Sequence, residues 1–217
     1  AGTDGYAAEI TRADGTTGRT RGGEATDSLG LSPDVMRVSF RTGDDYLGWL
    51  STYFNVPNVF GSAGPSDARH QTERYVGADC ADVLVGALRA AGLTDLSYTS
   101  ISGLDRLAEP RTAVLSMDAA GTVRDAEGEP HALRWGEDVA PGDLLAIDYS
   151  DDPDGKLPRS WDHIGALVED RGERGPDGVL DGRDLLRHVT ALGLGNRPLQ
   201  GRAPMRLRIW RWRAMPP

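Results

Sequence analysis

The chain has 217 residues, enough for one sizeable domain that needs no disulfide or metal for stability. Its 24 Lys and Arg against 33 Asp and Glu give a net charge of −9, which disfavours a general binder of nucleic acid or other polyanions. A single cysteine excludes an intrachain disulfide, and no window approaches the roughly 20 apolar residues that a membrane span needs. The 28 glycines and 13 prolines predict short elements joined by many turns.

The first 43 residues carry turn signals at Asp14-Gly15 and at 21–23, and strand patterns at 6–11 and 35–40. We interpret residues 1–43 as an N-terminal elaboration packed on a main domain of residues 44–217. Their role is not legible from the sequence.

Apolar residues then recur at the spacing of one helical face, which predicts a helix at about 44–54 that stops near Asn55. A second stripe predicts the best-defined helix, with Asp79 capping its start and Gly92 ending it in a left-handed turn. Within that helix Gly86 costs about 1 kcal/mol relative to Ala. We therefore expect another backbone to pack closely there.

Strand patterns follow at five places, separated by turn-rich stretches; they are 112–117, 143–147, 163–168, 185–191 and 205–212. Helices followed by a set of short strands predict an α+β domain. Its antiparallel sheet would carry the helices packed on one side.

The sole cysteine, Cys80, lies at the start of the best-defined helix. Helix starts expose unpaired N–H groups and a partial positive charge, which favour a thiolate and can bind a developing oxyanion. A structural cysteine would fit better inside the apolar stripe. Cys80 is therefore a candidate nucleophile.

A thiolate nucleophile needs a partner that takes and returns a proton, and two of the four histidines lie in predicted strands. Strand alternation places His163 and Gly165 on one face, so that Gly165 leaves room for an approaching group. His188 lies in the next predicted strand. Adjacent antiparallel strands could place the two imidazoles side by side, with His188 orienting His163.

Three short motifs together resemble a known family: Tyr75-x-x-Gly-x-Asp-Cys80 opening a helix, Pro141-Gly-Asp-Leu-Leu leading into a strand, and Asp162-His163-Ile-Gly on the next strand. With a polar residue on the following strand, this order is similar to that of the NlpC-type papain-like cysteine peptidases and amidases of bacterial cell walls. The resemblance covers about residues 75–191. It implies a papain-like fold with a partly barrel-like central sheet.

The resemblance also implies roles for residues of this chain. Cys80 would be the nucleophile, His163 the general base and His188 the orienting residue. The residues assigned to substrate binding are Tyr75, Asp79, Asp82, Trp161 and Asp162. No metal or cofactor is expected.

By the same resemblance, the chain is expected to hydrolyse an amide bond in peptidoglycan stem peptides, so its partner is a peptide or a peptidoglycan fragment. The resemblance and the start at Ala1 rather than Met lead us to expect an extracellular or periplasmic location. The oligomeric state stays open.

Two features depart from the family pattern. Ala81-Asp82 replaces the usual Ser-Gly after the cysteine, and an anionic Asp82 near the thiolate would raise the pKa of the thiol. The interval from Cys80 to His163 is long, which implies insertions at 104–135 and 151–160. Substrate preference is expected to reside in these insertions.

Two alternative functions stay open. One is a catalytically degenerate papain-like module that binds a peptide, glycan or protein. The other is an acyl transferase or amidase that acts on a non-wall substrate.

The remaining motifs favour structural interpretations. We expect His70 and His131 to lie on the surface, and the acidic stretch 148–154 to be a solvated loop because it lacks the ligand spacing of a calcium loop. The alternation of Arg with apolar residues at 205–213 is typical of a half-buried strand. Signatures of serine and zinc hydrolases are absent from the sequence.

Overall fold

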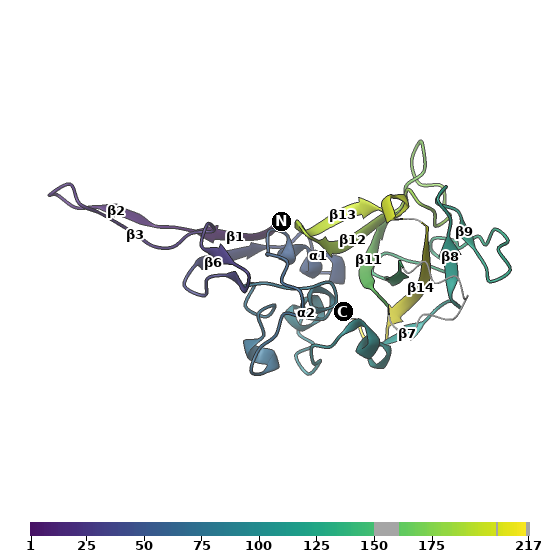
Figure 1. The fold of residues 1–217 in the computed structure, drawn as a ribbon, viewed down its shortest axis with the longest axis horizontal. Helices are drawn as coiled ribbons and strands as arrows, with labels where there is room; N and C mark the ends of the chain where they lie inside the picture. Colours follow the sequence, from purple (N-terminus) through teal and green to yellow (C-terminus); the bar gives the residue numbers. More distant parts are fainter. Residues whose placement is uncertain (150–160, 203, 216–217) are drawn as a thin grey trace. The chain divides into compact units, whose positions relative to one another are not determined.

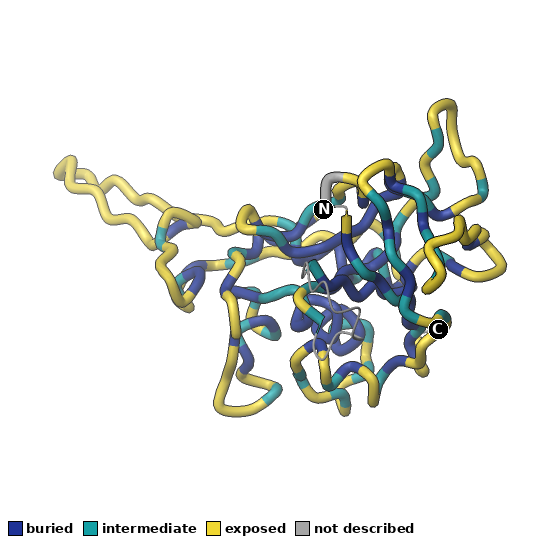
Figure 2. Tube along the Cα trace, turned by 45° about the vertical axis from the view of Figure 1, so that its right-hand side comes forward, coloured by how far each residue is buried: buried dark blue, intermediate teal, exposed yellow. Residues whose placement is uncertain are grey.

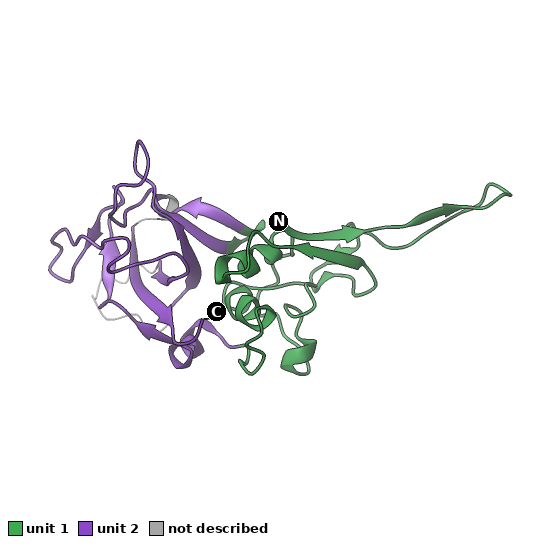
Figure 3. Ribbon diagram, turned by 180° about the vertical axis from the view of Figure 1, so that it is seen from behind, with its two compact units in different colours: residues 1–98, 189–194 green, residues 99–188, 195–217 purple. Residues whose placement is uncertain are grey.

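The computed structural model describes residues 1–149, 161–202 and 204–215, and it is a mixed α+β protein rich in strands (Figure 1). Its largest sheet is antiparallel, as predicted, and has eight strands. Over the described residues this sheet does not close into a barrel. The chain divides into two compact units (Figure 3). Unit 1 is Ala1–Tyr98 with Val189–Leu194, and unit 2 is Thr99–His188 with Gly195–Pro217.

Unit 1 begins with three small antiparallel pairings: β1 (Gly2–Tyr6) with β6 (Met36–Phe40), β2 (Glu9–Thr11) with β3 (Thr17–Arg19), and β4 (Thr26–Asp27) with β5 (Gly30–Leu31). The turn at Asp14-Gly15 and the strand at 35–40 are confirmed. The strand predicted at 6–11 is instead divided between β1 and β2. Every residue of β2 and β3 is exposed, and this hairpin extends away from the rest of unit 1 (Figure 2).

Buried Thr3 attaches β1 to residues 52–54, at the end of the first helix. Its backbone N–H donates to the Phe54 carbonyl at 2.8 Å, and its hydroxyl donates to the Thr52 carbonyl at 2.7 Å. Residues from the N-terminal region and from the predicted helices thus share one unit.

The first helix comprises α1 (Tyr46–Leu50) and a 3-10 turn, η1 (Ser51–Tyr53), which confirms the prediction for 44–54. Asp45 begins it by accepting a hydrogen bond from the Gly48 N–H at 2.6 Å. The chain then reverses at Asn55, whose φ of 68° lies in the left-handed region that asparagine tolerates.

The second helix, α2 (Asp82–Ala90), is buried from Asp82 to Arg89, and Gly92 ends it with a φ of 110°, as predicted. A Cβ atom at Gly86 would lie 2.4 Å from the Tyr53 hydroxyl oxygen and 2.9 Å from the Thr72 Cγ2. The prediction of a packed backbone at this glycine is wrong, since two side chains occupy the space. A short 3-10 turn, η2 (Asp67–Arg69), precedes this helix in the chain.

The large sheet has the strand order β13-β12-β11-β10-β14-β8-β9, and β7 also pairs with β14. The elements are η3 (Ile101–Arg106), β7 (Ala108–Pro110), β8 (Leu115–Met117), β9 (Val123–Arg124), β10 (Leu144–Asp148), β11 (His163–Glu169), β12 (Leu185–Thr190), β13 (Gly193–Pro198), η4 (Leu199–Arg202) and β14 (Met205–Trp212). All five predicted strands are present. The prediction missed β7, β9 and β13, which are short or rich in Gly, Asn and Pro.

One face of the sheet holds the core of unit 2. Leu145, Leu167, Leu186, Leu207 and Ile209 belong to one buried cluster contributed by β10, β11, β12 and β14. Alternate side chains of a strand point to opposite faces, which explains this selection. The strand at 205–212 is half-buried as predicted, and it is internal to the sheet because β10 pairs on one side of it and β7 and β8 on the other.

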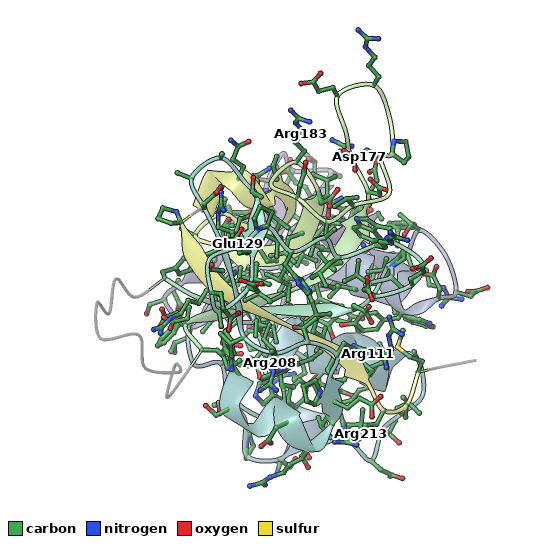
Figure 4. The ribbon with its side chains drawn as sticks, turned by 90° about the vertical axis from the view of Figure 1, so that its right-hand side faces the viewer. Arg111, Glu129, Asp177, Arg183, Arg208 and Arg213 are labelled. Atoms are coloured by element: carbon green, nitrogen blue, oxygen red, sulfur yellow. The ribbon has the colours of Figure 1, made fainter. Side chains whose placement is uncertain are left out.

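The Pro-Gly-Asp motif acquires a structural role in the fold. Gly142 has a φ of 90°, and the buried carboxylate of Asp143 accepts from the Ala140 N–H at 2.8 Å and from Arg211 Nε and Nη2 at 2.6 Å each. This two-point contact joins the start of β10 to the end of β14. By contrast, the next arginine, Arg213, which is labelled in Figure 4, is an exposed residue. It lies 3.8 Å from a half-exposed Glu109.

Asp184, which precedes β12, binds three donors from loops of unit 2. It accepts from Arg171 N–H at 2.6 Å, Asp181 N–H at 2.9 Å and Trp135 Nε1 at 3.0 Å. Burial raises the pKa of Asp184 to about 6. The loop between β11 and β12 and the segment that contains Trp135 are thus fixed on a buried carboxylate.

Two predictions concern the region after β10. Asp148, expected in a solvated loop, is a buried residue of β10 that lies 2.7 Å from Arg206. The rest of the acidic stretch from residue 150 on, and the insertion at 151–160, lie outside the described residues. Among the residues that the structure does describe, no helix is long and apolar enough to cross a bilayer.

Replacing Arg211 with Met tests the contact with Asp143. We expect Arg211→Met to lower the free energy of unfolding by about 2 kcal/mol, since it leaves a buried carboxylate with one remaining donor. Urea denaturation measures the change. Arg213→Met is the matched control, with a change within about 0.5 kcal/mol because its ion pair is exposed. Equal losses in the two variants would contradict this assignment.

Candidate functional site

Asp79 fixes the turn that carries the cysteine and leads into α2. Its Oδ1 accepts from the N–H groups of Ala81 and Asp82 at 3.0 Å each, so it binds donors at the helix start as predicted, although the N-cap position itself is Ala81. Its Oδ2 accepts from Gly61 N–H at 3.3 Å, so both oxygens have partners within unit 1. Half-buried Cys80 follows directly. Because α2 begins at Asp82, Cys80 lies in the turn just before the helix and not inside its first turn as predicted, next to the positive end of the helix. A role of Asp79 in substrate binding stays a prediction.

Tyr75 is held in an unusual backbone conformation five residues before Cys80. Its φ is 53°, a region that costs a non-glycine residue about 1–3 kcal/mol. Its ring stacks on Tyr53 with centroids 4.8 Å apart, and its hydroxyl lies 3.1 Å from Thr52 Oγ1. These contacts fix a half-buried ring that was assigned to substrate binding.

The structure places Asp82 inside unit 1, with 5% of its surface exposed. Its carboxyl accepts a hydrogen bond from the Ser62 hydroxyl, and one oxygen lies 3.9 Å from His70 Nε2. Burial, and secondarily the charge of Asp79, raise the pKa of Asp82 from 3.8 to about 7. Near neutral pH the carboxyl therefore holds a proton in part of the molecules, which weakens the repulsion expected toward a thiolate.

The prediction of a surface position for His70 is wrong. His70 is 7% exposed, and its ring stacks on Tyr98 with centroids 3.9 Å apart. Its Nδ1 accepts from Thr72 N–H at 3.3 Å, and burial lowers the pKa of the ring. Its polar, turn-rich surroundings in the sequence gave no sign of the stacking partner. His131, in contrast, is exposed as predicted.

The pH dependence of stability tests the buried position of Asp82. Because the folded protein raises the pKa of Asp82, ionisation destabilises it, and wild-type stability should fall as the pH rises from about 4 to about 7. Asn can accept the Ser62 hydrogen bond without charge. We expect Asp82→Asn to flatten this fall. At pH 8 its free energy of unfolding should exceed that of wild type by a few kcal/mol, at most about 4.

Denaturation curves between pH 4 and pH 8 measure that difference. Asp95→Asn removes the same charge from an exposed position and should follow the wild-type profile. A profile of Asp82→Asn parallel to wild type would show that Asp82 ionises normally in the folded protein.

In unit 2 the structure brings together the two predicted histidines. His163 Nε2 lies 2.7 Å from His188 Nδ1, and the rings meet at an interplanar angle of 74° with centroids 4.9 Å apart. They come from β11 and β12, which pair in the register Ala166 with Arg187 and Leu167 with Leu186. His188 is 2% exposed and His163 is half-buried, so His163 is the more accessible ring.

Gly165 permits this juxtaposition. A Cβ atom there would lie 2.8 Å from the Cβ of His188 and from the Arg187 carbonyl oxygen. The space that the sequence suggested for an incoming group is therefore taken by β12 itself. The absence of a side chain lets the His188 backbone come close enough for the imidazole contact.

The other predicted residues of unit 2 lie beside the pair in the chain. Exposed Asp162 accepts from Tyr149 N–H at 2.9 Å, and half-buried Trp161 meets Trp210 edge-on with centroids 6.1 Å apart. Their roles in substrate binding stay predictions. Tyr149, which the sequence analysis missed, has its ring centroid 6.3 Å from that of His163. Its position just after β10 is the signal that could have found it.

Comparisons of the chain with family models, with curated proteins and with solved structures give no match. Within residues 1–149, 161–202 and 204–215, no three His, Cys, Asp or Glu side chains gather as metal ligands would. The candidate groups are Cys80 with its capped helix in unit 1 and the histidine pair in unit 2.

Proposed function

We propose that the chain is a papain-like cysteine hydrolase of NlpC type that cleaves an amide bond. The observation that carries the proposal is the 2.7 Å contact between His163 and His188. An imidazole oriented by a second polar residue is what a general base needs. Support also comes from the hydrogen bonds of Asp79, which fix the turn that holds Cys80 just before the N-terminus of α2.

The contact between the histidines defines which nitrogen acts as the base. If His163 Nε2 carries the proton and donates it to His188 Nδ1, the lone pair on His163 Nδ1 is available. His163 Nδ1 then takes the proton of Cys80, and the thiolate attacks the carbonyl carbon. The Cys80 N–H and a neighbouring donor hold the oxyanion.

The second half of the reaction returns the proton. The C–N bond breaks, and protonated His163 gives its proton to the leaving amine. Water, deprotonated by His163, then attacks the thioester and regenerates the thiol. Water is the co-reactant, and no oxidant or reductant takes part.

The substrate proposed is the amide bond of a peptidoglycan stem peptide, with an extracellular or periplasmic location. The support is the motif resemblance, which includes the short sequences at Tyr75, Pro141 and Asp162. In this proposal the fold is papain-like, and the insertion at 104–135 tunes substrate preference.

Alkylation of the thiol tests the proposed pairing directly. We expect iodoacetamide to label wild-type Cys80 with a pH midpoint below about 8.5, and His163→Ala to move that midpoint upward because the thiolate loses its counter-ion. Muropeptide hydrolysis should fall about 10³-fold or more in Cys80→Ala. His131→Ala, at an exposed histidine, should leave both readouts unchanged.

Three results would overturn the hydrolase. They are hydrolysis unchanged in Cys80→Ala, a midpoint near 8.5, and a midpoint insensitive to His163→Ala. Retained ligand binding without turnover would favour the degenerate module, and transfer of the acyl group to an added amine would favour the transferase.

His188 is proposed as a positioning residue, and its substitution separates orientation from folding. We expect His188→Ala to lower kcat by about 10- to 100-fold with little change in KM, since His163 loses its acceptor. His188→Asn supplies an oxygen acceptor and should restore part of kcat. Equal kcat in the Ala and Asn variants, with unchanged thermal unfolding, would exclude a positioning role.

A further inference from the structure

Unit 1 contains a cavity of about 640 Å³ that the proposed hydrolysis does not use. One wall is the segment from Arg21 to Pro33, which includes the β4–β5 hairpin. The other wall is formed by residues of the segment 63–76. Both walls belong to the same unit.

Hydrogen bonds fix the two walls to each other. Gln71 Nε2 donates to the Leu29 carbonyl at 2.6 Å, while Gln71 Oε1 accepts from Ala63 N–H at 3.0 Å. Leu31 N–H donates to the Val76 carbonyl at 2.7 Å. A site held in this way is largely formed before a ligand arrives, which lowers the entropy cost of binding.

Three arginines line the cavity: Arg21, Arg69 and Arg74. Over the part of the chain that the structure describes, the guanidinium groups of Arg69 and Arg74 make no ion pair and no hydrogen bond. Arg37 lies nearby, and its pKa is lowered first by burial and then by the charge of Arg74. Cations thus outnumber anions in the lining.

The acidic residues of the lining are already engaged. Glu24 lies 3.2 Å from Arg19 and accepts from Gly22 N–H at 3.3 Å. Asp27 accepts from Leu29 N–H at 2.7 Å. Since three arginines face these two carboxylates, the lining keeps a net positive charge.

Part of the lining is apolar. It includes Ala25, Leu29, Leu31, Pro33, Pro65 and Val76. An apolar body with a negatively charged group complements this combination.

We propose that this cavity binds a small ligand with a carboxylate or phosphate group on an apolar body. The planar fork of arginine matches both groups by paired hydrogen bonds, so Arg69 and Arg74 would hold the anion while the apolar wall covers the body. The site does not depend on Cys80, and so it stands apart from the proposed hydrolysis.

Isothermal titration calorimetry tests the site with three probes. N-acetyl-leucine presents a carboxylate, phenyl phosphate presents a phosphate, and N-acetyl-leucinamide is the neutral counterpart of the first. We expect saturable binding of at least one anion, with affinity falling as NaCl is raised and with the amide about tenfold weaker or undetectable. The probe that binds more tightly shows whether the cavity prefers a carboxylate or a phosphate.

Variants locate the binding in the cavity. Arg69→Gln and Arg74→Gln should each weaken the anion about tenfold, and Leu29→Asp at the exposed rim should also weaken it. Arg12→Gln removes the same charge from the exposed end of β2–β3 and should bind like wild type, as should Cys80→Ala. Thermal unfolding checks that each variant is folded.

Two results would overturn the proposal: no saturable binding of either anion, or equal weakening by Arg12→Gln and the cavity variants. Loss of binding in Cys80→Ala would instead place the ligand at the thiol and also contradict a separate site.

Discussion

Buried carboxylates connect distant segments of this strand-rich chain, and one of them, Asp82, lies beside the candidate nucleophile Cys80. Asp82, Asp143 and Asp184 are each 5% exposed or less. Each accepts hydrogen bonds from groups remote in sequence: Ser62 for Asp82, Arg211 for Asp143, and Trp135 for Asp184. Since an unpaired buried carboxylate is costly, each of these contacts fixes the loop or strand that supplies the donor.

The turn that carries Cys80, just before α2, shows how this constraint serves chemistry. Asp79 and Asp82 hold Gly61 and Ser62 against the start of the helix, so a loop without regular structure acquires a defined position. The negative charges of these two carboxylates would destabilise a nearby thiolate. The raised pKa of Asp82 lessens that opposition because the buried carboxyl keeps a proton over more of the pH range.

The histidine pair depends on backbone approach instead. β11 and β12 come close at Gly165, and only a residue without Cβ permits that spacing, so the imidazoles meet at 2.7 Å. The arginine-lined cavity of unit 1 is fixed by a third device, the amide of Gln71 bridging two loops. The proposed hydrolysis and the proposed anion binding thus depend on different contacts. A variant that loses one activity can therefore keep the other.

The sequence by itself determined the elements whose apolar period is regular: the helix ending at Gly92, the strands at 163–168 and 205–212, and the pairing of His163 with His188. These depend on local spacing and on neighbouring strands. Tertiary structure alone decided that His70 is buried on Tyr98, that Asp82 turns toward Ser62, and that the strands of the described residues do not close into a barrel. Such outcomes depend on partners far away in the chain, and a residue's own surroundings in the sequence carry no record of which partner desolvates it.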